Sequence, residues 1–456
     1  MTGRYQAYPE YKDSGVEWLG NVPEHWEVVP LKRLCSLITG LTPPTENKEN
    51  YVDDNAGYPW VRPEDLSDNG QVVKASKYVS GTGWKLLRHV SAQSTLICCI
   101  GTIGKVGYTD IEVSSNQQIT AARFTKSPRY NFYLIQSAKT MLEEVATGNV
   151  VKILNSERLG RVKLLSAPSL EAAKIANFLD HETAKIDTLI EKQQQLIKLL
   201  KEKRQAVISH AVTKGLNPDV PMKDSGVEWL GEVPEHWGRS NLGFECSVKA
   251  RLGWKGLKAE EYVEEGCIFL ATPNIKEKEI DFENVNYITK ERYDESPEIK
   301  LEVGDVLVTK DGSTTGTTNV VRRLPSPTTI NSSIAVLRSN GRINSLYLYY
   351  FFVSTYTQNV IKHMQGGMGV PHLFQADLRK FKLLMPPLEE QLDIASYIEG
   401  RIPMFELLLE KAMLEIRLLK ERRTALISAA VTGKIDVRNW QLPGSRMGKG
   451  VSRAHQ

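Results

Sequence analysis

Two nearly identical copies of a fifteen-residue segment constrain the fold of this chain more than any other feature. KDSGVEWLGNVPEHW at residues 12–26 recurs as KDSGVEWLGEVPEHW at 223–237, with fourteen of the fifteen positions identical. A second match joins residues 191–213 to 410–432, with fourteen of twenty-three positions identical. Two such matches, at offsets of 211 and 219 residues, predict a tandem pair of similar units.

The ends of the two units are alike, whereas their middles are not. We interpret the ends as a shared scaffold and the middles as surfaces for two different targets. An old duplication followed by neutral drift of the middles is the alternative. Short β-type runs bounded by glycine, such as 94–101 and 304–312, occur in both middles. They predict small, strand-rich α+β domains.

The second repeated segment predicts a long coiled-coil helix in each unit. Residues taken alternately four and three apart are apolar at six of eight positions from Ile186 to Ala211, and at seven of eight from Phe405 to Ala430. This spacing is that of a coiled-coil seam. The residues predicted to form the helix-pair and partner interface are Ile186, Ile190, Ile197, Leu200, Arg204, Val207, Leu409, Ile416, Leu419, Arg423 and Leu426.

Neither helix can bury its apolar stripe alone, so we expect the two to pack together antiparallel. Each seam covers about 28 residues, or roughly 42 Å of helix. A shorter helix is expected before each one, at about 170–180 and 388–399, with a break at Pro403. Arg204 and Arg423 share one seam position. Either their stems lie along the seam with the charged heads in water, or they make a register or partner contact.

The first repeated segment is interpreted as packing, because its tryptophans bring large apolar surfaces. His25 and His236 occur at the same position of the two copies, and a catalytic role is one interpretation of them. No acid or nucleophile recurs beside them at a diagnostic spacing, however, so a structural role is favoured.

Motifs for catalysis are missing from the sequence. It contains no GxxxxGK[ST] phosphate loop, no GxSxG, no HExxH and no Asn/Asp-Pro-Pro-Tyr/Phe motif of adenine methyltransferases. Its five cysteines form no CxxC pair, and no His/Cys cluster suggests a metal site. We therefore expect a chain that is not an enzyme and binds no metal.

Composition is ordinary for a globular protein, with 41% hydrophobic and 25% charged residues. There is no run of about 18 apolar residues, and the N-terminus has no apolar secretion signal. Together with the cysteine pattern, this predicts a cytoplasmic protein with no membrane partner. The net charge of +4 is compatible with a locally basic surface but does not require one.

Basic side chains surround an aromatic one in KARLGWKGLK at 249–258, which contains no acid. This pattern suits a phosphate backbone, although a plain solvated loop is the alternative. The residues of this segment predicted to bind DNA are Lys249, Arg251, Trp254, Lys255 and Lys258. Weaker candidates in the first unit are Arg62, Lys85, Arg88 and Lys105. The basic runs at 198–204 and 417–423 are interpreted as solvated helix faces or as partner- or DNA-facing surfaces.

The duplicated WLG…VP-x-HW segment, the PPLEEQ sequence at 386–391 and the LLKEKR…AVISHAVT helix together resemble the specificity subunit of type I restriction–modification enzymes. The match spans the whole chain, although the first copy reads PSLEAAK at 168–174. The resemblance implies an α+β fold with two globular target-recognition domains, separated by two long antiparallel helices in a pseudo-twofold tandem repeat. Each domain would read one half of a split DNA sequence, while the helices set the spacer and dock methyltransferase subunits.

The resemblance also implies partners and cofactors. The partners are double-stranded DNA, two methyltransferase subunits and the restriction–translocation subunits. S-adenosylmethionine, ATP and magnesium would belong to those subunits, and this chain would hold no cofactor. A duplicated coiled-coil scaffold that binds protein or RNA, without reading DNA, is the alternative.

Members of this family tend to carry a glycine loop like G-S-T-x-G-K in each recognition domain. Here the loop at 101–105 is one residue short, and the loop at 312–316 is followed by threonine rather than lysine. From the second loop, the residues predicted to bind DNA are Lys310, Ser313 and Thr314. Asn116 and Asn331 follow the two loops at matching places and are interpreted as structural.

These expectations define a domain plan. It comprises a first recognition domain at 1–167, a central helical region at 168–214, a second recognition domain at 215–385, a distal helical region at 386–435 and a basic, disordered tail at 436–456.

Overall fold

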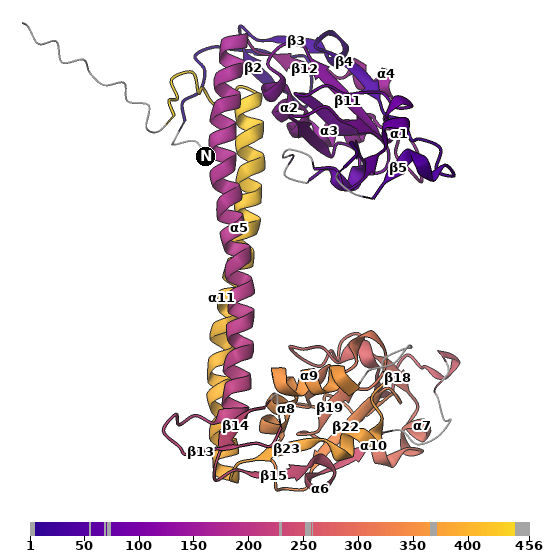
Figure 1. The fold of residues 1–456 in the computed structure, drawn as a ribbon, viewed down its shortest axis with the longest axis vertical. Helices are drawn as coiled ribbons and strands as arrows, with labels where there is room; N and C mark the ends of the chain where they lie inside the picture. The colour runs from indigo at the N-terminus through magenta and orange to yellow at the C-terminus, as the bar shows by residue number, and fades with distance from the viewer. Residues whose placement is uncertain are drawn as a thin grey trace, which may run out of the picture. The chain divides into compact units, whose positions relative to one another are not determined.

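The computed structural model describes residues 5–442, apart from 54–55, 68–69, 71–73, 228–229, 251–256, 258 and 365–371. The chain divides into two compact units (Figure 1). Unit 1 contains Met1–Gln193 and Leu414–Gln456, and unit 2 contains Gln194–Met413. Each unit therefore combines one strand-rich domain with half of each long helix.

The two long helices are α5, Ser169–Lys214, and α11, Leu388–Val431, with 46 and 44 residues. At 1.5 Å per residue they are about 69 and 66 Å long. The predicted separate short helices and the break at Pro403 are wrong, because Pro403 lies inside α11. Proline at this place removes one hydrogen bond of the helix, to the carbonyl of Glu399, and its exposed side chain displaces no packed neighbour.

In unit 1 the first half of α5 packs against the second half of α11 (Figure 1). The seam residues buried there in one core are Ile186, Ile190, Leu419 and Leu426. Arg423 lies among them, 8% exposed, and forms a bidentate ion pair with Asp187. Its Nε and Nη2 donate to Oδ1 and Oδ2 of Asp187 at 2.9 and 3.3 Å. Of the two readings of this arginine, the register contact is confirmed.

In unit 2 the second half of α5 packs against the first half of α11. One core contains Ile208 and Val212 from α5 together with Ile394 and Ile398 from α11. Leu409 is also buried. The remaining seam residues of this unit, all partly buried, are Ile197, Leu200, Arg204 and Val207. The prediction of antiparallel coiled-coil helices is confirmed in each unit.

The first repeated segment anchors the start of α5. Trp26 is fully buried, and its Nε1 donates to Oε1 of Glu171 at 3.1 Å. Tyr8 donates its hydroxyl to the same oxygen, and Nε2 of His25 lies 2.9 Å from Oε2. One carboxylate in the first turn of α5 therefore holds three aromatic side chains.

The second repeated segment anchors the start of α11 in the same way. Trp237 Nε1 donates to Oε1 of Glu390 at 3.0 Å, and His236 Nε2 lies 2.8 Å from Oε2. The structural interpretation of both histidines is confirmed. An acid does recur beside them, but it lies 146 and 154 residues away in sequence, so no local spacing reveals it.

Glu171→Ala is expected to lower the free energy of unfolding by about 1–3 kcal/mol, because it leaves a buried indole N–H without an acceptor. Glu390→Ala is the matched variant. The Glu390 side chain is 27% exposed against 7% for Glu171, so water replaces part of its bonding and the loss is smaller. Thermal unfolding of the two variants measures this order, and a larger loss for Glu390→Ala would contradict it.

The strand-rich domain of unit 1 contains two four-stranded sheets with the orders β4-β11-β8-β9 and β10-β6-β7-β5. Two further strand pairs, β1 with β2 and β3 with β12, complete it. The strands are β1 Tyr11–Asp13, β2 Asn21–Pro23, β3 Glu27–Pro30, β4 Cys35–Thr39, β5 Tyr51–Val52, β6 Tyr58–Val61, β7 Tyr78–Val79, β8 Ser94–Cys98, β9 Val106–Thr109, β10 Ser114–Ser115, β11 Ile119–Phe124 and β12 Lys163–Ser166. The helices are α1 Gly81–Lys85, α2 Pro128–Ser137, α3 Lys139–Val145 and α4 Ser156–Arg161.

The strand-rich domain of unit 2 contains sheets of order β16-β22-β19-β20 and β18-β17-β21, with the pairs β13 with β14 and β15 with β23. The strands are β13 Met222–Asp224, β14 Glu232–Pro234, β15 Gly238–Asn241, β16 Cys246–Lys249, β17 Cys267–Leu270, β18 Asn286–Ile288, β19 Val306–Thr309, β20 Thr318–Val320, β21 Thr328–Ile330, β22 Ile334–Ser339 and β23 Lys382–Met385. The helices are α6 Leu242–Glu245, α7 Lys290–Asp294, α8 Ser345–Val353, α9 Thr355–Met364 and α10 Gln375–Lys380.

The unlike middles share one fold. The antiparallel order β4-β11-β8-β9 of the first domain corresponds to β16-β22-β19-β20 of the second. In the other sheet, β6 pairs parallel with β10 and antiparallel with β7, just as β17 pairs parallel with β21 and antiparallel with β18. The predicted fold class is confirmed: two strand-rich α+β domains in a tandem repeat with two long antiparallel helices.

The start of the predicted disordered tail is packed instead. Asp436 forms a β-bridge with Gln6, and Val437 is buried. The Trp440 ring lies 5.6 Å from that of Phe178, centroid to centroid. Apolar side chains at the beginning of the tail explain the difference from a purely basic segment, and residues 443–456 lie outside the described part of the chain.

Across the described residues, no helix has the length and apolar character needed to span a bilayer.

Candidate nucleic-acid interface

The two glycine loops follow equivalent strands. One joins β8 to β9 and the other joins β19 to β20. Gly101 and Gly312 open them, both with φ of +81°. This left-handed conformation favours glycine, which explains why both loops retain it.

The first loop is held by backbone hydrogen bonds on both sides. The Cys99 N–H donates to the Gln118 carbonyl at 2.7 Å, and the Leu154 N–H donates to the Cys99 carbonyl at 2.8 Å. The Asn116 side chain accepts from the Gln118 N–H at 3.2 Å, closing the adjacent turn. The structural interpretation of Asn116 is confirmed.

The second loop has the same frame. The Lys310 N–H donates to the Ser333 carbonyl at 2.7 Å, and the Leu373 N–H donates to the Lys310 carbonyl at 2.8 Å. The Asn331 side chain accepts from the Ser333 N–H at 3.1 Å, so its structural interpretation is confirmed too.

The predicted DNA-binding residues of the second loop lie close together but differ in exposure. Ser313 and Thr314 are exposed at its tip, within a short 3-10 helix over Gly312–Thr314. Lys310 is only 8% exposed, and burial lowers the pKa of its ammonium, although the neighbouring Asp311 carboxylate acts in the opposite direction. The tip, rather than Lys310, offers the freely accessible groups.

The basic segment before this loop is described only in part. Lys249 is half-buried at the end of β16. The other predicted residues of this segment, Arg251, Trp254, Lys255 and Lys258, lie outside the described residues, so their DNA contacts remain a prediction.

The residues of the first domain that are predicted to bind DNA differ in exposure and in the partners that they already have. Arg62 is already engaged, since its Nη2 lies 2.6 Å from Glu64 and 3.2 Å from the Ser76 hydroxyl. Arg88 is exposed but donates to the Thr39 carbonyl at 3.0 Å. The Lys85 side chain is exposed, and Lys105 is half-buried at the end of its loop. Among the described residues, these four cations share no hydrogen-bond or ion-pair partner.

An open cavity of about 370 Å³ lies beside the second loop, within unit 2. It is lined by residues 313–318 of the loop, Lys362 of α9 and Arg204 of α5. Arg204 therefore differs from its seam counterpart Arg423, which is buried against a carboxylate. This cavity adds Lys362 to the cations near the loop, a residue that the sequence did not single out.

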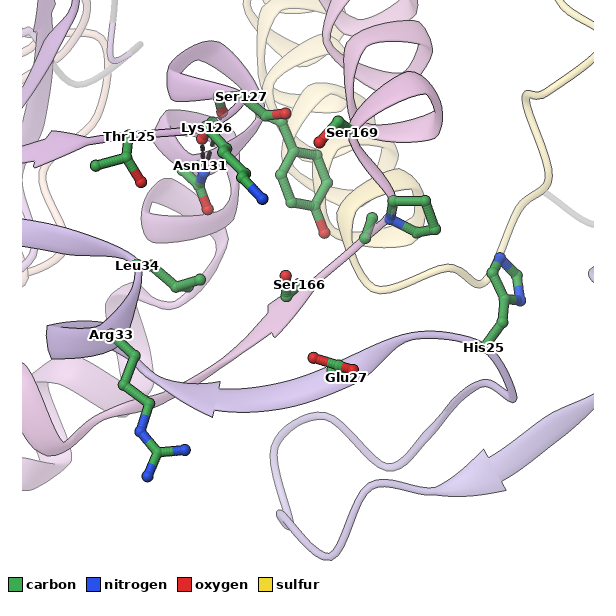
Figure 2. Close-up of a pocket in the computed structure, with 13 residues that line it drawn as sticks. His25, Glu27, Arg33, Leu34, Thr125, Lys126, Ser127, Asn131, Ser166 and Ser169 are labelled. Atoms are coloured by element: carbon green, nitrogen blue, oxygen red, sulfur yellow. Dashed lines mark hydrogen bonds between the residues drawn. The ribbon is translucent and has the colours of Figure 1, made fainter.

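A second open cavity, of about 390 Å³, lies in unit 1 where the repeated segment meets the start of α5 (Figure 2). His25, Arg33 and Lys126 contribute to its lining, but none of the predicted DNA-binding residues does. Asn131 braces its wall by donating to the Lys126 and Ser127 carbonyls at 2.9 and 3.1 Å. The cavity thus belongs to the scaffold.

Within the described ranges, no cluster of three or more His, Cys, Asp or Glu is arranged to hold a metal ion.

Comparison with known proteins places the chain in a family. The family model described as "Type I restriction modification DNA specificity domain" matches residues 23–199 and 257–403, well over half of the chain. The MjaVIII type I restriction enzyme specificity subunit of Methanocaldococcus jannaschii is 23% identical over 431 residues, covering 92% of this chain and 95% of that protein. The EcoKI specificity subunit of Escherichia coli is 22% identical over 211 residues, 45% of this chain and 44% of that protein.

Solved structures agree on the fold. A chain from work on complex assembly and conformational transition of the type I R-M system has a TM-score of 0.63 at 16% identity, covering 90% of this chain and 98% of that chain. The HsdS subunit from Thermoanaerobacter tengcongensis has a TM-score of 0.50 at 16% identity, covering 91% and 98%. The alternative of a scaffold without DNA reading finds no support among these relatives. The chain therefore belongs to the family of type I restriction–modification DNA specificity subunits.

Proposed function

We propose that this chain reads a bipartite double-stranded DNA target, with each recognition domain reading one half. One observation carries this proposal: two domains with the same sheet order and the same loop frame present different side chains on a repeated scaffold. Base edges carry sequence information, whereas contacts to phosphate mainly supply affinity. Two different loop surfaces on one frame suit two different half-sites.

The helices are proposed to set the spacer between the half-sites. Half-sites one DNA turn apart are about 34–36 Å from centre to centre. With 46 residues, or about 69 Å, α5 is long enough to support readers at that separation. The paired seam residues in each unit stiffen the support.

The helices are also proposed to dock two methyltransferase subunits. Besides the buried seam, they carry exposed leucines. In unit 1 they include Leu189, Leu414 and Leu418, and in unit 2 they include Leu196, Leu199, Leu407 and Leu408. Apolar side chains that repeat along the exposed face of a helix are typical of a surface that binds another protein.

Catalysis is proposed to belong to the partners. The sequence lacks methyltransferase, nucleotide-binding and hydrolase motifs, which supports a recognition subunit that is not itself an enzyme. S-adenosylmethionine, ATP and magnesium would then bind to the methyltransferase and restriction–translocation subunits, in the cytoplasm.

An exchange of residues 30–160 for those of another family member tests the proposal. We expect one half of the methylated DNA motif to change and the other half to stay the same, as read by mapping methylated bases in the host genome. Asn21→Glu is the matched control, because it makes the first repeated segment identical to the second and leaves the motif unchanged. A motif that changes in both halves, or in neither, would contradict the division of labour.

A further inference from the structure

The two glycine loops carry opposite chemistry at one equivalent place. In the first domain, Ile100 forms an antiparallel β-bridge with Ile153. In the second domain, the bridge at the same point of the loop frame joins Asp311 to His372. The backbone is shared, so the exchange of two apolar side chains for an acid and a histidine is not needed to build the loop.

The acid and the histidine contact each other at the surface. Nδ1 of His372 donates to Oδ1 of Asp311, because an ionised carboxylate can only accept. The side chains are 38% and 31% exposed. Among the described residues, no other hydrogen bond uses the Asp311 carboxylate, so its second oxygen is available to a donor from outside the chain.

The Phe374 side chain lies next to this pair, at a position where a polar side chain would stabilise the start of helix α10 better. Phe374 occupies the N-cap position of α10, is 60% exposed and makes no side-chain capping bond. Its ring lies edge-on to His372, with centroids 4.3 Å apart. In the first domain the equivalent cap is Asn155, which accepts from the Arg158 N–H at 2.9 Å.

Phenylalanine is disfavoured at an N-cap, where a short polar side chain satisfies the helix N–H groups. An exposed aromatic ring also gains little from burial. Positions at which a residue breaks such a local rule are expected to be functional or strained.

Resting on the proposed function, we infer that Asp311, His372 and Phe374 form a specificity-determining cluster, which reads a base edge in the half-site of the second domain. Asp311 accepts a hydrogen bond from the exocyclic amino group of cytosine or adenine in the major groove. His372 is a positioning residue that fixes the carboxylate. Phe374 makes an apolar contact with a neighbouring base, of the kind that thymine methyl groups provide.

The first domain offers no such acceptor at this place. Ile100 and Ile153 are apolar, and burial raises the pKa of the adjacent Cys99 thiol to about 11, so the thiol is uncharged at neutral pH. The two domains therefore read their half-sites with different chemistry on one frame.

The test uses the full chain assembled with its methyltransferase partners. Asp311→Asn keeps the size of the side chain but replaces a pure acceptor by an amide. We expect discrimination at one base pair of one half-site to fall roughly fivefold, the lower end of the range for a bidentate base contact, because only one oxygen of Asp311 is available to the base. Methylation rates on duplexes with single base-pair changes measure this, and the affected base pair shows whether cytosine or adenine is read.

Phe374→Asn is the second variant. It supplies the cap that the first domain uses, so the thermal midpoint should not fall, while discrimination at a neighbouring base pair does. Phe244→Asn is its control, since Phe244 is another exposed phenylalanine of this domain, in α6, and its replacement leaves selectivity unchanged.

Different outcomes contradict the proposed function and the base-reading role of Asp311, His372 and Phe374. An assembled wild-type protein that directs methylation to no bipartite sequence overturns the proposed function. A wild type with a bipartite motif, together with Asp311→Asn and Phe374→Asn variants that keep its selectivity at every position, overturns this inference alone.

Discussion

Arg423→Met is expected to lower the free energy of unfolding of unit 1 by about 3–5 kcal/mol, because it removes the guanidinium that compensates the buried charge of the Asp187 carboxylate. Asp187 is only 7% exposed, and the guanidinium of Arg423 occupies both of its oxygens. Methionine keeps the aliphatic volume of the seam, so the loss reports on the charge rather than on a cavity. Urea unfolding, followed by a probe in unit 1, measures it.

Arg204→Met is the matched control at the same seam position. Arg204 is half-buried and lines an open cavity, so its replacement should cost far less. The double variant Asp187→Leu with Arg423→Met removes both charges and should recover most of the stability. Equal losses for Arg423→Met and Arg204→Met would show that the ion pair does not stabilise the helix pair.

A heptad inserted into both long helices, after Leu200 in α5 and after Leu409 in α11, is expected to lengthen the spacer of the recognised sequence. Seven residues add about 10 Å of helix while keeping the seam on the same face. That length corresponds to about three base pairs at 3.4 Å per step. Mapping of methylated bases compares the spacers directly.

A heptad inserted after Leu200 alone is the control. It shifts every following seam residue of α5 against an unchanged α11, so we expect loss of assembly rather than a longer spacer. An active complex with the double insertion and an unaltered spacer would falsify the proposal that the helices set the gap.

The sequence predicted the repeats, the strand-rich domains and the seam, because each leaves a local or periodic pattern. The prediction of a break at Pro403 was wrong because packing of the rest of the helix outweighs the one hydrogen bond that proline removes, and no local pattern shows that packing. The contact between Glu171 and His25 was not predicted, because the two residues lie 146 positions apart in the sequence. Likewise, Asp311 and His372 are 61 residues apart in the chain.

The sequence predicted that both middles are strand-rich, but it did not show that they share one strand order. Their sheets and loops are defined by backbone hydrogen bonds, such as those of Cys99 and Lys310, which do not depend on side-chain identity. Side chains on such a frame can change freely, so similarity of sequence is lost while the architecture stays.

Unit 1 is built from two separate stretches of the chain, and this determines when it can fold during synthesis. Unit 2 consists of one uninterrupted stretch, Gln194–Met413, whereas unit 1 needs both Met1–Gln193 and Leu414–Gln456. During synthesis unit 1 can therefore be completed only after unit 2 has been made, and the apolar stripe of α5 in unit 1 stays uncovered until then. Premature termination near residue 413 would thus damage the half of the protein that was translated first.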